Sequence, residues 1–297
     1  MIALVTASAA RAHDDDLPPL CSALDADRLP HAVEVWSDPS VTWSRYDLAI
    51  LRSTWDYASR PKEFLAWIDV VSTQTTLLNP APVLRWNTDK HYLASLAAAG
   101  VPIVPTSFFE PGDTVQLPSE ELVIKPAIGA GSLDCARFSP ARRSEALAHA
   151  TNLLNQGRSI LVQPYQSAID RDGETALIHF DGVFSHAIRK GPILAQPADL
   201  VGGLFAREDI SPRIPTDAQR AVASAALAAV PDGYSPLLYA RVDLVPGQNG
   251  PAVLELELCE PSVFLAYGNN AAKRFAAAIA SRITARCSGR VERHATR

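Results

Sequence analysis

The sequence predicts an α/β fold in two parts: a Rossmann-like N-terminal unit, then a larger part with antiparallel sheets. Residues 1–85 alternate short apolar runs with amphipathic segments of helical length, as parallel α/β units do. Later in the chain, two pairs of alternating apolar runs flank tight turns, which is typical of β-hairpins. A length of 297 residues with 47% hydrophobic content is enough for two compact units or for one elaborated α/β domain.

The composition excludes several classes of function. The net charge is −5 and the basic residues are scattered, so we expect no binding of nucleic acid or of an anionic membrane. No apolar run approaches the ~20 residues that a membrane span needs. The apolar start lacks a basic n-region, which favours a buried strand over a signal peptide. The four cysteines have no CxxC or CxxH spacing, so we predict neither zinc nor disulfides, and a cytoplasmic location.

The first unit is predicted to end at a proline-rich segment, residues 79–83. We therefore place a domain boundary at residue 83, with 1–83 as one domain and 84–297 as the other. The strands expected in the first domain are 2–7, 32–36, 47–51 and 76–78, and the helices are 17–26 and 61–71.

Polar clusters follow two of these strands, and ligands of parallel sheets gather at the carboxyl ends of strands. In one cluster, the Arg52 guanidinium is suited to binding a substrate carboxylate, with Trp55 and Tyr57 as walls. We predict that Arg52, Trp55 and the adjacent Asp56 bind the substrate. The acidic run 14–16 more simply caps the helix that follows it.

Two lysines in the second part are candidates for binding an anion. Lys90 falls in the first turn of a predicted helix, 87–99, where the helix dipole disfavours a cation unless an anion lies nearby. Taken alone, Lys90 is better explained as an ordinary surface lysine. Lys125 lies in a predicted strand, 122–126, and is followed by the sequence AIGAGS.

Within AIGAGS, Gly129 and Gly131 allow the backbone to approach an anion closely, and Ser132 adds a hydroxyl group. The segment lacks the P-loop pattern, so a plain loop between strands is the alternative.

Further along, Gln163 ends a predicted strand, 159–165, and its amide offers the donor and the acceptor that an adenine edge needs. A local hydrogen bond to its own loop is the alternative. A hairpin at 173–190 then brings Arg189 or Lys190 towards a phosphate or a substrate anion, unless both are simply solvated.

The hairpin is followed by a long loop, 191–213, which contains Gly202 and Gly203 and has the length of a lid. Helices are expected at 215–230 and 270–286.

The hairpin at 238–258 places Arg241, Asp243, Glu255 and Glu257 on one face of a sheet. The opposite face is expected to carry apolar residues: Val242, Leu244, Leu254, Leu256 and Leu258. Like charges at about 4–5 Å repel by roughly 4 kcal/mol in a protein cleft, so a cation such as Mg²⁺ is expected there. A solvated face of an antiparallel sheet is the alternative.

The order of these parts resembles the ATP-grasp superfamily, and its glutathione synthetase-like ligases in particular. The resemblance covers residues 85–285, with the first unit matching the α/β domain that precedes the grasp. Within the superfamily, the segments RSTWDY, LVIKPAIGAGS, YARVDLV and LELELCEPSVFL are most similar to the O-ureido-D-serine cyclo-ligases, which form D-cycloserine.

The resemblance implies two subdomains in 84–297: an ATP-binding lid at about 100–190, with a Mg²⁺-binding catalytic subdomain as the remainder. The ATP-binding residues that it implies are Lys90, Lys125, Gly129, Gly131, Ser132, Gln163, Pro164 and Tyr165. Asp243, Glu255 and Glu257 would hold two Mg²⁺ ions, for which Mn²⁺ can substitute.

Arg241, Arg189 and Lys190 would act in catalysis, with Gly202 and Gly203 near the substrate. Glu257 departs from the asparagine that relatives commonly carry at this position, which puts metal occupancy in question.

The reaction that the resemblance implies is activation of a substrate carboxylate as an acyl phosphate, followed by attack of a nitrogen. In a cyclo-ligase that nitrogen belongs to the same molecule, so a ring closes. An intermolecular carboxylate–amine ligase and a non-catalytic Mg·ATP-binding protein are the alternatives. The expected partner is a small amino acid-like substrate, and a homo-oligomer is left open.

Overall fold

The computed structural model describes the whole chain except residues 193–199, 202–203, 207, 232–235 and 296–297. Its first part is a four-stranded parallel sheet in the order β2-β1-β3-β4. The strands are β1 Ile2–Thr6, β2 His31–Val35, β3 Leu48–Ser53 and β4 Thr76–Leu78. The helices of this part are α1 Leu17–Ala26, α2 Pro61–Gln74 and α3 Ala81–Asn87. The predicted parallel α/β unit is confirmed.

Alternate side chains of β1 and β3 face different helices, as the pleat of a strand requires. Ile2, Leu4, Leu48 and Ile50 pack with α1 and with α8 (Ala271–Ala295), the last helix of the chain. Ala3, Val5, Ala49 and Leu51 pack instead against Phe64, Ile68 and Val71 of α2. Both faces are therefore buried, which explains the uninterrupted apolar runs of these strands.

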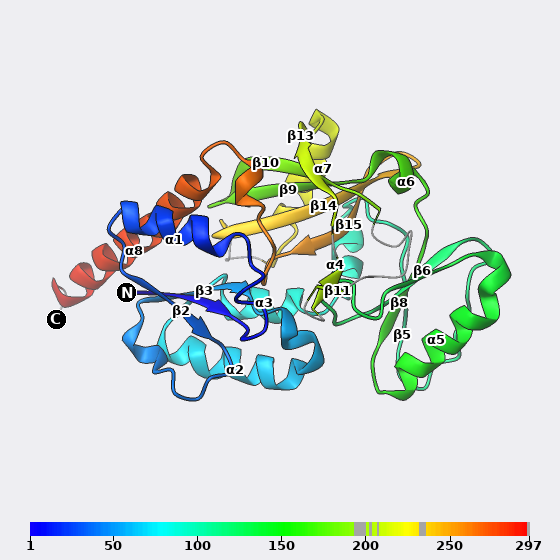
Figure 1. Cartoon of the computed structure of the whole chain (residues 1–297), viewed down its shortest axis with the longest axis horizontal. Coiled ribbons are helices and arrows are strands. Elements are labelled where there is room, and N and C mark those ends of the chain that lie inside the picture. Colours follow the sequence, from blue (N-terminus) through cyan, green and yellow to red (C-terminus); the bar gives the residue numbers. More distant parts are fainter. Residues whose placement is uncertain (193–199, 202–203, 207, 232–235, 296–297) are drawn as a thin grey trace.

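A five-stranded antiparallel sheet forms the centre of the molecule, in the order β13-β10-β9-β14-β15 (Figure 1). Its strands are β9 Glu174–Phe180, β10 Val183–Lys190, β13 Ile210–Arg213, β14 Tyr239–Gly247 and β15 Gly250–Glu257. One apolar face packs against α4 (Tyr92–Ala98) and α7 (Asp217–Ala228). Both hairpins predicted from the sequence are present, paired as β9 with β10 and β14 with β15.

A second antiparallel sheet has the order β5-β8-β6-β7 and lies at the far end of the molecule from the N-terminal unit (Figure 1). Its strands are β5 Ser107–Phe109, β6 Leu122–Pro126, β7 Ala136–Phe138 and β8 Ile160–Pro164. Helix α5 (Arg143–Asn155) covers one face of this sheet. The chain also forms α6 (Ala168–Asp172) and a short pair of strands, β11 (Leu200–Val201) with β12 (Phe205–Ala206). None of the described helices is long and apolar enough to cross a membrane.

Three expectations about helices need correction. Residues 87–99 do not form one helix, because Asn87 is the last residue of α3 and α4 begins at Tyr92. Lys90 therefore lies in the turn between the two helices, and not in a first helical turn. The expected boundary at residue 83 falls inside α3, where Val83 is buried. The last helix continues to Ala295 instead of ending at 286.

The β14–β15 hairpin also departs from the predicted register. Arg241 pairs with Glu257 and Asp243 with Glu255, as expected, but a bulge follows and Leu244 pairs with Val253. The bulge removes Leu254 from the apolar face, so that it packs near Val104 and Ile169 instead. A bulge inserts one unpaired residue, which strict alternation cannot anticipate.

Buried polar side chains join the N-terminal unit to the central sheet. The Asp16 carboxylate accepts hydrogen bonds from the backbone N–H groups of Val263, Phe264 and Leu265, at 2.7, 3.0 and 2.7 Å. It makes no side-chain capping bond to α1, so the predicted role of the acidic run as a helix cap is wrong. Tertiary backbone donors satisfy this carboxylate instead.

Asn79 forms a second link of this kind. Its amide donates to the carbonyls of Tyr239 and Leu258 and accepts from Leu238 N–H, each at 2.9 Å. The side chain is fully buried, so these backbone groups have no access to water as a substitute partner.

Replacing Asn79 with alanine should lower the free energy of unfolding by about 2–4 kcal/mol, because three buried backbone groups lose their partner. Urea denaturation followed by circular dichroism measures this change. Asn152→Ala, on the exposed face of α5, is the matched control and should shift the value by less than about 0.5 kcal/mol. Equal stabilities of the two variants would contradict the assigned role of Asn79.

Candidate active site

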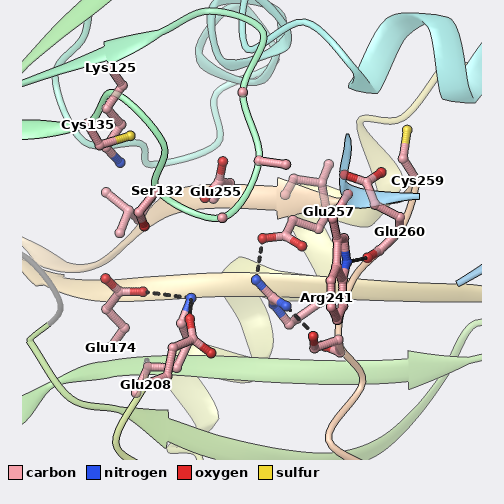
Figure 2. Close-up of a pocket in the computed structure, with 18 of the residues that line it drawn as sticks. Lys125, Ser132, Cys135, Glu174, Glu208, Arg241, Glu255, Glu257, Cys259 and Glu260 are labelled. Atoms are coloured by element: carbon pink, nitrogen blue, oxygen red, sulfur yellow. Dashed lines mark hydrogen bonds and ion pairs between the residues drawn. The ribbon is translucent and has the colours of Figure 1, made fainter. Parts of the chain in front are cut away.

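A cavity of about 740 Å³ opens between the N-terminal unit, the central sheet and the β5–β8 sheet. Strand β14 contributes Arg241, and β15 contributes Glu255 and Glu257 (Figure 2). Lys90, Lys125 and the glycine-rich loop at 129–132 line the same space. Residues from Ala12 to Tyr267 are thus brought around one space, whose volume is typical of ligand sites.

Three carboxylates, those of Asp243, Glu255 and Glu257, have oxygens within 4.8 Å of one another. Asp243 is fully buried, and the two glutamates are partly exposed towards the cavity. The sequence prediction that these residues converge is confirmed. Converging carboxylate oxygens are the donors that Mg²⁺ and Mn²⁺ prefer, so this group fits a hard divalent cation.

Three cationic side chains surround this acidic group. Arg241 donates to Asp243 at 2.9 and 3.0 Å and also bonds Glu257. Lys190 donates to Asp243 at 3.0 Å. Lys90 forms an ion pair with Glu255 at 2.9 Å. Because Arg241 and Asp243 are two residues apart on β14, their side chains share one face, as the alternation predicted.

The surroundings shift the pKa values of Glu255 and Glu257 in opposite directions. Burial raises the pKa of Glu255, but Lys90 and Lys125 outweigh it and hold the pKa at about 2. The pKa of Glu257 is raised to about 7. Desolvation by burial and repulsion from Glu255 and Asp243 together exceed the lowering effect of Arg241. Glu257 thus has less compensating positive charge around it than Glu255, which suits a carboxylate that would ligate a cation.

The glycine-rich loop is connected directly to the acidic hairpin. Lys90 donates from its ammonium group to the Gly129 carbonyl at 2.9 Å while it pairs with Glu255. Gly131 and Ser132 both have positive φ, at 62° each, and this curls the loop back over the cavity. Figure 2 shows Ser132 at the tip of the loop facing β15, with Lys125 behind it. The loop and both lysines therefore meet at one end of the cavity.

At this same end, Gln163, Pro164 and Tyr165 line the cavity as predicted. The Gln163 amide nitrogen donates to the Thr106 hydroxyl at 2.9 Å, while its buried Oε1 has no hydrogen-bond partner within the described structure. The acceptor half of the predicted donor–acceptor pair is therefore without a partner in the described structure. An exocyclic amino group, such as that of adenine, fits this orphaned acceptor.

Two predicted substrate-binding residues do not reach the cavity. Arg52 is fully buried within β3, where it donates to the Pro261 carbonyl at 3.0 Å and lies 3.7 Å from Asp16. Asp56 turns away to accept from Trp36 at 2.7 Å and from Arg60 at 2.6 Å. Strand β3 extends two residues beyond its predicted end, which draws Arg52 into the packed interior.

Arg189 does not reach the cavity either, because it lies on the face of β10 that points away from the cavity. It donates to the Asp172 carbonyl at 3.2 Å and pairs with Asp209 at 3.3 Å. Its neighbour Lys190 points the other way, into the cavity, as alternation requires. Gly202 and Gly203 lie outside the described residues.

Several acidic side chains of the cavity carried no sequence motif and were not predicted. Glu174 and Glu208 flank Lys190 at 3.4 and 3.5 Å. Glu260 follows β15 and is only 9% exposed. Burial, together with the charge of Glu257, raises the pKa of Glu260 to about 8. The Cys-Glu-Pro sequence at 259–261, just after the acidic strand, is the one local sign that could have indicated Glu260.

Comparison with known proteins gives a consistent result. Residues 2–79 match the family model described as the N-terminal domain of the D-cycloserine synthetase DcsG. The chain is 41% identical over 298 residues to the cycloserine biosynthesis protein DcsG of Streptomyces lavendulae, covering 95% of this chain and 99% of that protein.

The fold is shared with solved structures. The crystal structure of D-cycloserine synthetase DcsG matches with a TM-score of 0.85 and 40% identity, over 95% of this chain and 99% of that one. The ATP-grasp ligase PsnB, complexed with a phosphomimetic variant of its minimal precursor, Mg and ADP, matches at 0.59 and 15% identity, over 94% and 97%. The predicted ATP-grasp fold is confirmed.

Binding of Mg²⁺ or Mn²⁺ without nucleotide should release a proton and weaken as the pH falls below about 7. Glu257 is protonated in that range and must ionise to bind a cation, so apparent affinity should fall up to about tenfold per pH unit. Isothermal titration calorimetry between pH 6 and 8, in buffers of different ionisation enthalpy, measures both effects.

The matched control for this titration is Glu257→Gln, which carries no titratable group at this position. It should bind the cation more weakly and show little pH dependence. A wild-type affinity that is constant from pH 6 to 8, or an unchanged pH dependence in the variant, would contradict this assignment.

Proposed function

The chain belongs to the DcsG family of D-cycloserine synthetases, which have the ATP-grasp fold, and we propose that it closes the ring of O-ureido-D-serine to form D-cycloserine. It is an ATP-dependent carbon–nitrogen ligase that uses Mg²⁺. The observation that carries the proposal is the three-carboxylate group with its lysines and Arg241, facing the glycine-rich loop across a cavity.

The proposed reaction has three steps. The substrate carboxylate attacks the γ-phosphate of ATP, which gives an acyl phosphate and ADP. The ureido nitrogen bound to oxygen then attacks the acyl carbon, phosphate leaves, and a five-membered ring forms. Water finally removes the carbamoyl group from that nitrogen as carbon dioxide and ammonia. Ring closure is favoured because both reacting groups belong to one molecule.

Different residues of the cavity are suited to different parts of this reaction. Lys90, Lys125 and the glycine-rich loop are placed to bind the phosphates, and the free Gln163 acceptor suits the adenine amino group. Asp243, Glu255 and Glu257 would hold two Mg²⁺ ions, which neutralise phosphate charge when bound. Arg241 is held by Asp243 and presents its guanidinium towards the transferred group.

Trp55 and Tyr57 line the opposite end of the cavity, on the N-terminal unit, and we assign this end to the substrate. Cys21, Cys135 and Cys259 are free thiols, which agrees with the cytoplasmic location we propose. Self-association stays a prediction.

Incubation with ATP, Mg²⁺ and O-ureido-D-serine should release ADP, phosphate and ammonia and yield D-cycloserine by mass spectrometry. ADP release without D-cycloserine, or a product that joins two molecules, would instead indicate an intermolecular ligase. Binding of Mg·ATP without any substrate-dependent ADP would indicate a non-catalytic protein. A coupled ADP assay and the mass of the product separate these outcomes.

Glu255→Gln should lower kcat by at least about 100-fold while the protein remains folded, because Glu255 is partly exposed and isosteric with glutamine. Asp243→Asn should lose both activity and stability, since the buried Arg241 and Lys190 would each lose the charge of the carboxylate that they share. Full turnover by Glu255→Gln would contradict the assigned metal site.

A further inference from the structure

Glu260 is a buried carboxylate in the cavity that the reaction described above does not use. It lies three residues after Glu257, the last residue of β15, and Figure 2 shows it on the side of Glu257 away from Glu255. The side chain is only 9% exposed, and its Oε2 has no hydrogen-bond partner within the described structure. A buried carboxylate oxygen without a partner costs free energy unless a ligand satisfies it.

Two aromatic residues of the N-terminal unit hold Glu260 in place. The Trp55 indole nitrogen donates to the Glu260 carbonyl at 3.0 Å. The Tyr57 side chain is 4% exposed, and its hydroxyl group interacts electrostatically with the Glu260 carboxylate. Both aromatic side chains also line the cavity. The corner therefore combines a fixed carboxylate with aromatic walls, and these are the groups that recognise an ammonium ion.

The charge around Glu260 is not balanced by the protein. Within the described residues, no lysine or arginine forms an ion pair with it, since the nearby Lys90 is taken by Glu255. Eight carboxylates line the cavity against four lysine and arginine side chains. The carboxylates are Asp14, Asp15, Asp16, Glu174, Glu208, Glu255, Glu257 and Glu260. An incoming cation at this corner would relieve the imbalance.

We propose that Glu260, supported by Trp55 and Tyr57, binds the α-ammonium group of the substrate. This inference rests on the proposed function, which brings an α-amino acid to the cavity. The ammonium is attached to the carbon next to the carboxylate that is phosphorylated, so the two groups must bind within a few ångströms of each other. Glu260 suits this requirement because it lines the same cavity, three residues after Glu257 at the end of β15.

Asp14 is the rival carboxylate, because its Oδ2 is also buried without a partner in the described structure. Its other oxygen accepts from the Asp16 N–H at 3.0 Å. Asp14 acts electrostatically on Asp16 and Cys21, which both lie on the N-terminal unit. Asp14 is therefore the matched control, and Glu260 is the assigned anchor.

The test compares O-ureido-D-serine with 3-(ureidooxy)propanoate, which is the same molecule without the amino group. Wild-type enzyme should prefer the amino substrate by at least about 100-fold in kcat/KM, because the analogue leaves Glu260 unpaired. Glu260→Gln should reduce this preference to below about 5-fold, chiefly by raising KM for the amino substrate. Asp14→Asn should retain the wild-type preference.

Every other outcome of this test would contradict one specific claim. An equal loss on both substrates in Glu260→Gln would make Glu260 a proton-transferring or structural residue, and loss of the preference in Asp14→Asn would assign the anchor to Asp14. If Glu260→Gln fails to fold, Glu260→Asp replaces it and should lower the preference about tenfold. No turnover of O-ureido-D-serine by the wild type would contradict the proposed function itself.

Discussion

The crowding of negative charge on the β14–β15 hairpin is the constraint on which the rest of the site depends. Asp243, Glu255 and Glu257 share one small surface, and their mutual repulsion is only partly offset by the cations around them. Lys90 and Arg241 each contact a carboxylate and a second part of the cavity. The compensation of charge therefore also positions the glycine-rich loop and the segment after β15. The same side chains in this protein both balance charge and position the elements of the site.

Fully buried polar contacts explain why the N-terminal unit is part of the site. Asp16, Arg52 and Asn79 all bond backbone groups of the segments that contain or follow the acidic hairpin. These bonds fix the 258–265 segment against the first sheet and thereby bring Trp55 beside Glu260. The sequence suggested Arg52 as a ligand for a substrate, but Arg52 is buried and instead holds the backbone at Pro261 in place.

Part of the site was predictable because it depends on local rules. Alternation along a strand placed Asp243 with Arg241 and separated Lys190 from Arg189, although it could not say which of the last two faces inward. The bulge at Leu254 and the break between α3 and α4 were not predictable. Each is stabilised by distant partners, as when the Asn87 amide bonds the backbone of Leu256 and Leu258.

The sequence by itself determined the element types, the two hairpins and the group of carboxylates, because periodicity and turn chemistry act over a few residues. Its resemblance to ATP-grasp ligases indicated the fold and the class of reaction. Only the tertiary structure decided which polar residues face the cavity, turning Asp56 away and bringing Glu260 in. That choice depends on how separate layers pack, since a side chain's exposure is set by the surfaces that close over it and not by its neighbours in the chain.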